Sequence, residues 1–128
     1  MKQHILIIDD EATIRALLAQ FLTGSGYRVT AVASAAEALK AVQQDPPHLI
    51  ISDLQLEDAD GLEMIAELKE ALPHAPVILL TGVLFEPDVV RDVLSKKVAC
   101  YLEKTSSLGE ILKTVCRLLP PSAPGSAN

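Results

Sequence analysis

The chain has 128 residues, the usual size of one domain, and this is long enough to bury a hydrophobic core without disulfide or metal support. Its formal net charge of −6 argues against direct contact with nucleic acid. Its apolar residues, 49% of the total, occur in runs far shorter than the roughly 18 residues of a membrane span. We therefore expect a globular domain that contacts neither nucleic acid nor membrane.

Five short apolar runs, each bounded by turn residues, predict strands that are buried on both faces of a sheet. They are Ile5–Ile8, Arg28–Val32, Leu49–Ser52, Val77–Leu80 and Val98–Leu102.

Five segments with apolar residues at helical spacing alternate with these strands. Ser34 with Glu37, and Ser107 with Glu110, form capping-box patterns that mark the start of the second and fifth helices. The five helical patterns run over residues 14–22, 34–42, 62–72, 87–94 and 107–119.

Strands that alternate with helices predict an α/β fold with a parallel sheet covered on both faces. The simplest arrangement is a flavodoxin-like, doubly wound, five-stranded sheet of order 2-1-3-4-5 with five helices. We assign residues 1–119 to this domain. Residues 120–128 contain only Pro, Ser, Ala, Gly and Asn, which is typical of a flexible tail or the start of a linker.

The N-terminus and the cysteines indicate a cytoplasmic protein. Residues 1–4 lead directly into the first strand, which leaves no room for a signal peptide. Cys100 and Cys116 lack metal-ligand spacing, so we expect two reduced thiols.

Acidic residues follow two strands that this order makes neighbours. Asp9 and Asp10 come directly after the first strand, and Asp53 comes directly after the third. Carboxylates that converge in this way repel one another unless a divalent cation lies among them, and a few hard oxygen ligands suit Mg²⁺. The fourth and fifth strands bring Thr81 and Lys104 to the same edge.

This set of residues favours phosphoryl chemistry. One aspartate beside the metal can attack a phosphoryl donor, while the ion and Lys104 neutralise the phosphoryl oxygens and Thr81 offers a hydroxyl. Each residue also has an ordinary structural role as a cap, turn or surface residue. Because the carboxylates, the hydroxyl and the ammonium group converge on one edge of the sheet, a functional site is favoured over separate structural roles. The three histidines, His4, His48 and His74, are expected at the opposite edge in structural or exposed positions.

The same residues resemble the receiver domain of two-component response regulators. The matching motifs are Ile-Ile-Asp-Asp-Glu at 7–11, Asp53 with Gly61 eight residues later, Thr81-Gly82, and Tyr-Leu-Glu-Lys at 101–104. Their order and spacing extend the resemblance over residues 3–119.

The resemblance implies that Asp53 is the phosphoacceptor. It implies that Asp10, Asp53 and the backbone carbonyl of Gln55 bind Mg²⁺ or Mn²⁺ directly, and that Asp9 holds the ion through water. The phosphoryl donor would be a histidine kinase or a phosphotransfer protein.

The resemblance also implies a switch. Thr81 would move toward the phosphoryl group, Lys104 would be its counter-ion, and Tyr101 would turn inward. The surface that changes would be formed by the fourth helix, the fifth strand and the fifth helix. It would bind an effector domain or an output partner, or form a phosphorylation-dependent dimer.

Two positions depart from the family pattern. Glu57 and Thr105 stand where prolines are usual, and Thr105 predicts a trans peptide bond after Lys104. We interpret the chain as a signalling switch whose only chemistry is phosphoryl uptake and self-dephosphorylation. Two alternatives remain, an aspartate-nucleophile phosphatase resembling the haloacid dehalogenases at residues 9–13, and a docking domain that works without phosphorylation.

Overall fold

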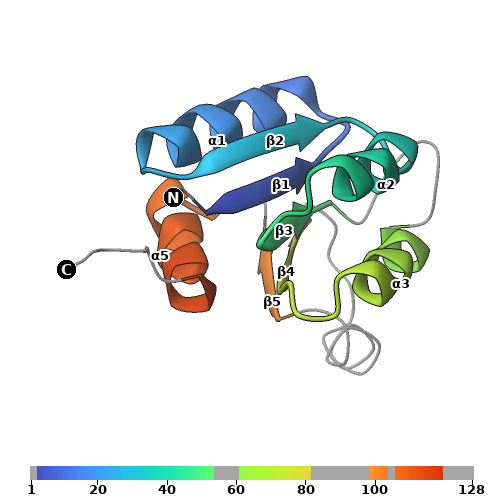
Figure 1. Ribbon diagram of the computed structural model, residues 1–128. Coiled ribbons are helices and arrows are strands. Elements are labelled where there is room, and N and C mark those ends of the chain that lie inside the picture. The colour runs from blue at the N-terminus through green and yellow to red at the C-terminus, as the bar shows by residue number, and fades with distance from the viewer. Residues whose placement is uncertain (1–2, 54–60, 82–98, 104–105, 120–128) are drawn as a thin grey trace.

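The computed structural model describes residues 3–53, 61–81, 99–103 and 106–119 (Figure 1). None of the helices in these ranges is long and apolar enough to cross a membrane. Along the chain the elements are β1 (His4–Ile8), α1 (Ala12–Gly24), β2 (Arg28–Val32), α2 (Ala35–Gln44), β3 (Leu49–Ser52), α3 (Gly61–Ala71), β4 (Val77–Thr81), β5 (Cys100–Glu103) and α5 (Leu108–Leu118).

The five strands form one sheet of order β2-β1-β3-β4-β5, and every described pairing is parallel. The predicted fold class and strand order are confirmed. The predicted fourth helix falls within residues 82–98, which lie outside the described residues.

Helices cover both faces of the sheet, with α1 and α5 on one side and α2 and α3 on the other (Figure 1). Successive side chains of a strand point to opposite faces, so β1 contributes to two cores. Ile5 and Ile7 pack with the α1 and α5 residues, whereas Leu6 and Ile8 pack with α2 and α3. This double burial is why the strands are almost continuously apolar.

Serine side chains cap α2 and α5 at the two positions where capping boxes were predicted. The Ser34 hydroxyl accepts a hydrogen bond from the Glu37 N–H (3.2 Å), and the Glu37 carboxylate accepts one from the Ala33 N–H (3.2 Å). The Ser107 hydroxyl accepts from the Glu110 N–H (3.1 Å) in the same way. These bonds satisfy N–H groups that have no partner within the helix.

Three strands differ slightly from their predicted ranges. β1 begins one residue earlier, at His4, β4 extends one residue further, to Thr81, and β5 runs over Cys100–Glu103 where Val98–Leu102 was predicted. The Ala99 N–H donates to the Val77 carbonyl (2.8 Å), so the pairing with β4 begins just before β5 itself.

One large apolar residue of α1, Leu17, does not face the core. Leu18 and Leu22 are buried as predicted, but Leu17 remains 46% exposed. Consecutive helical residues are separated by about 100° around the axis, so Leu17 lies outside the stripe centred between the two buried leucines.

Candidate functional site

Asp9 and Asp53 directly follow two neighbouring strands at the same edge of the sheet. The β1–β3 register pairs Ile8 with Ser52, the last residues of these strands. The Asp53 N–H donates to the Ile8 carbonyl (2.9 Å), and the Asp9 N–H donates to the Val32 carbonyl of β2 (3.1 Å). Backbone pairing therefore continues into both acidic residues and holds them side by side.

Four carboxylates meet at this edge. Asp9, Asp10, Glu11 and Asp53 each offer one oxygen, and these four atoms lie within 4.8 Å of one another. Asp9 and Asp53 are only 2% and 4% exposed, Asp10 is half-buried, and Glu11 is exposed. Burying like charges together is costly without a cation, and carboxylate oxygens are ligands that Mg²⁺ and Mn²⁺ prefer. The donor set therefore fits such an ion.

Of the other predicted site residues, some are described by the structure and some lie outside the described ranges. Thr81 ends β4 and pairs with Glu103, the last residue of β5, so its backbone reaches the same edge of the sheet. Tyr101 pairs with Leu79 in the middle of the same ladder. The predictions for residues 55, 57, 104 and 105 fall outside the described ranges.

Three further residues belong to this acidic edge of the sheet. Glu11, which the sequence motif at 7–11 contains without an assigned role, joins the carboxylate group. The other two, Arg15 and Ser52, were not predicted from the sequence. The Arg15 guanidinium donates through Nη1 to the Asp9 carbonyl (2.8 Å), and the buried Ser52 hydroxyl donates to the Asp53 carbonyl (2.9 Å). Ser52 gave a usable signal, because a hydroxyl in a fully buried strand requires a partner. Arg15 gave only its position near the start of a helix.

The family comparison covers most of this architecture. The family model of the response regulator receiver domain matches residues 5–116. The chain belongs to this family. The match includes both acidic strand ends and four of the five described strands in full, together with β1 from its second residue.

Related proteins place the receiver domain within longer chains. It is 32% identical over 123 residues to the transcriptional regulatory protein GlrR of Escherichia coli strain K12, covering 96% of this chain and 28% of GlrR. It is 33% identical over 129 residues to the alkaline phosphatase synthesis transcriptional regulatory protein PhoP of Bacillus subtilis, covering 98% of this chain and 53% of PhoP. The chain thus spans about a quarter of one relative and about half of the other.

Solved structures share the receiver fold. A CheY-like receiver domain from Methanospirillum hungatei superimposes with a TM-score of 0.85 at 26% identity, covering 91% of this chain and 93% of that one. The chemotaxis protein CheY4 of Vibrio cholerae gives a TM-score of 0.86 at 26% identity, covering 93% and 100%.

The histidines of this receiver domain lie at the opposite edge of the sheet, where the sequence predicted them. His4 is the first residue of β1 and is buried. His48 directly precedes β3, His74 precedes β4, and both are exposed. None of the three belongs to the carboxylate group among the described residues.

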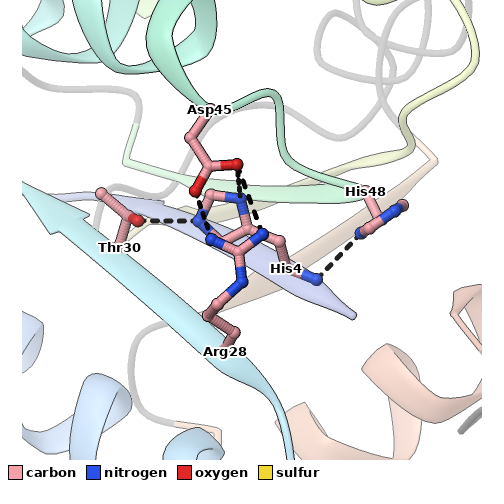
Figure 2. Close-up of polar contacts among 5 residues, drawn as sticks. All are labelled: His4, Arg28, Thr30, Asp45 and His48. Carbon is pink, nitrogen blue, oxygen red and sulfur yellow. Dashed lines mark hydrogen bonds and ion pairs between the residues drawn. The ribbon is translucent and has the colours of Figure 1, made fainter. Parts of the chain in front are cut away.

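His4 joins three elements through polar contacts (Figure 2). The His4 Nε2 lies 2.7 Å from the Thr30 hydroxyl, and the His4 Nδ1 lies 3.8 Å from Asp45 Oδ1. The backbone N–H of His4 donates to His48 Nδ1 (2.9 Å). The Arg28 guanidinium forms a bidentate ion pair with the same Asp45 carboxylate. Burial, helped by the Arg28 charge, lowers the pKa of His4 below 6.5, and the hydrogen bond from Arg28 lowers the pKa of Asp45.

Proposed function

We propose that this receiver domain is a phosphoryl-accepting switch of a two-component phosphorelay, with Asp53 as the phosphoacceptor. The observation that carries the proposal is the register of β1 and β3, which sets Asp53 beside Asp9 and Asp10. One carboxylate oxygen from each of these residues lies within 4.8 Å of the others. The Asp9 Oδ1 accepts a hydrogen bond from the Glu11 N–H (2.9 Å), which is consistent with a supporting role for Asp9.

The ion is proposed to bind among these carboxylates. Asp10, Asp53 and the Gln55 carbonyl would hold Mg²⁺ or Mn²⁺ directly, and Asp9 would hold it through water. When bound, the ion neutralises charge that develops on the phosphoryl oxygens. Lys104 adds a second positive charge from the residue that follows β5.

The transfer is a displacement at phosphorus. A carboxylate oxygen of Asp53 forms the new P–O bond as the P–N bond of a donor phosphohistidine breaks. The electron pair of the broken bond remains on the imidazole nitrogen, which takes up a proton. Later attack by water on phosphorus returns the carboxylate and releases inorganic phosphate, so the chemistry begins and ends on Asp53.

The donor is proposed to be a histidine kinase or a phosphotransfer protein, and this domain is proposed to act in the cytoplasm. Thr81 and Tyr101 would carry the change to the surface formed by residues 89–96, Tyr101 and residues 110–117. The described part of this surface contains a depression of about 320 Å³ lined by Leu102, Glu110, Lys113, Thr114 and Arg117. An effector domain, an output partner or a second phosphorylated copy could bind there. The names of the longer relatives as transcriptional regulators favour the effector domain among these candidates.

Intact-protein mass spectrometry after incubation with acetyl phosphate tests the proposal. We expect the mass of one phosphoryl group to be added only with Mg²⁺ or Mn²⁺ present, and hydroxylamine to remove it, as expected for an acyl phosphate. Asp53→Asn should abolish the gain, and circular dichroism should show that this variant folds. An equal mass gain in Asp53→Asn would refute the assignment.

A further inference from the structure

Three hydrogen bonds at the turn between β1 and α1 converge on Asp9. The Asp9 N–H donates to Val32, its Oδ1 accepts from the Glu11 N–H, and its carbonyl accepts from Arg15 Nη1. Arg15 supplies the only described side chain that holds the backbone carbonyl of this acidic residue.

The Asp9 carbonyl matters because it belongs to the peptide plane that joins Asp9 to Asp10. A peptide unit is rigid, so a hydrogen bond that fixes its carbonyl also fixes the direction in which the next residue leaves the turn. The Arg15 contact at 2.8 Å therefore sets the backbone from which the Asp10 carboxylate extends toward Asp53.

The position of Arg15 is not explained by the stability of α1. It is the fourth residue of a helix that begins at Ala12, and the first turn of this helix carries no acidic side chain. A cation near a helix N-terminus opposes the helix dipole, whereas an acid there would stabilise the helix. In addition, the described residues offer Arg15 no carboxylate in ion-pair contact. Its one described side-chain bond is to the carbonyl of Asp9.

We propose that Arg15 is a positioning residue of the acidic site, which orients the Asp9–Asp10 peptide so that both carboxylates face the bound ion. This inference rests on the proposed function, because it needs the Mg²⁺ site to exist. Arg15 acts through the backbone and touches neither the ion nor the phosphoryl group.

The sign of the change in Mg²⁺ affinity separates positioning from a simple charge effect. Removing a cation near the site lowers its repulsion of Mg²⁺, so a pure charge effect predicts tighter binding in Arg15→Ala. Loss of positioning predicts weaker binding, because ligands held loosely must be ordered by the ion. The two explanations therefore predict opposite shifts.

The experiment is a calorimetric titration of the full 128-residue chain with MgCl₂. We expect Arg15→Ala to raise the Mg²⁺ dissociation constant about tenfold, the low end for residues that orient metal ligands. Arg15→Lys, which keeps a donor and the charge, should recover part of the affinity. Lys40→Ala removes the same charge from an exposed position on α2 and should leave the affinity within about twofold of the wild type.

The outcomes separate this inference from the proposed function. Unchanged or tighter binding in Arg15→Ala, with wild-type binding intact, overturns the role of Arg15 alone. Failure of the wild-type chain to bind Mg²⁺ overturns the metal site and the role of Arg15 together. If thermal melting shows that Arg15→Ala is unfolded, Arg15→Gln replaces it, and equal or tighter binding there overturns the inference.

Discussion

At the residue scale, two adjacent aspartates of the same chemical type occupy different environments. Asp9 is almost fully buried, continues the backbone ladder and accepts a hydrogen bond at Oδ1. Asp10 is half-buried and lies one peptide further, where the chain leaves the sheet for α1. A carboxylate already engaged with its own turn suits an indirect role, and the next one suits direct contact with the ion.

We therefore expect Asp10→Ala to weaken Mg²⁺ binding more than Asp9→Ala does. A reasonable expectation is a loss of about 100-fold against about tenfold, since a direct ligand matters more than a group that acts through water. Asp10→Ala should also stabilise the metal-free protein, because it relieves repulsion among the carboxylates. Mg²⁺ titration and urea unfolding without metal measure the two effects.

Glu70→Ala provides the matched control for these variants, because it removes an exposed carboxylate near the far end of α3. It should change neither the Mg²⁺ affinity nor the metal-free stability appreciably. A larger loss of affinity in Asp9→Ala than in Asp10→Ala would show that the assignment of the direct ligand is reversed.

At the element scale, local signals predicted most of the fold and part of the site. The apolar runs and capping boxes at Ser34 and Ser107 define elements whose alternation permits few topologies, and the parallel sheet then brings Asp53 beside Asp9. Tertiary partners were not predictable in this way. The exposure of Leu17 depends on how α1 packs, and the hydrogen bond of Arg15 to a strand-end carbonyl leaves no periodic pattern in the sequence.

The His4 cluster shows how elements are joined at the edge away from the site. His4 starts β1, Thr30 lies in β2, and Asp45 caps the carboxyl end of α2. One buried imidazole therefore contacts a neighbouring strand and the end of a helix. Because burial is the largest cause of the lowered pKa of His4, this position favours a neutral imidazole.

We expect the free energy of unfolding to fall as the pH drops below about 6.5. The unfolded chain takes up a proton at His4 near 6.5, whereas the folded chain does so only at lower pH. Between these two values the unfolded state binds more protons, so the contribution of His4 is complete above 6.5 and is lost progressively below it. The slope cannot exceed about 1.4 kcal/mol per pH unit for this single group.

Urea unfolding between pH 7.5 and pH 5 of the wild type, His4→Gln and His74→Gln measures this contribution. His4→Gln should flatten the profile below about pH 6.5, whereas His74→Gln, which alters an exposed histidine, should keep the wild-type profile. Arg28, Asp45 and His48 also face His4, so identical profiles in all three proteins would assign the pH dependence to groups other than His4.

At the scale of the whole molecule, the two edges of the sheet have different roles. The amino ends of the strands carry the His4 cluster, in which opposite charges pair, and the carboxyl ends carry like charges that repel. Two apolar cores on either side of the sheet support both edges. A rigid sheet can therefore tolerate an unfavourable group of charges at one edge, and a ligand that relieves this repulsion would favour a different local arrangement.

We expect phosphorylation of Asp53, which follows β3, to change the environment of α5, a helix that is distant in the sequence. β4 ends at Thr81 beside the end of β5, and Leu102 of β5 packs partly against the core that α5 covers. A new negative charge on Asp53 should attract the Thr81 hydroxyl, and the β4–β5 pairing gives this movement a direct route to β5 and residues 110–117.

Backbone amide NMR shifts, recorded with Mg²⁺ before and after addition of acetyl phosphate, should change both around Asp53 and in residues 110–117. Thr81→Ala should still gain the mass of a phosphoryl group but lose most of the shift changes in residues 110–117. Changes confined to the residues around Asp53 in the wild type would show that the signal does not reach α5.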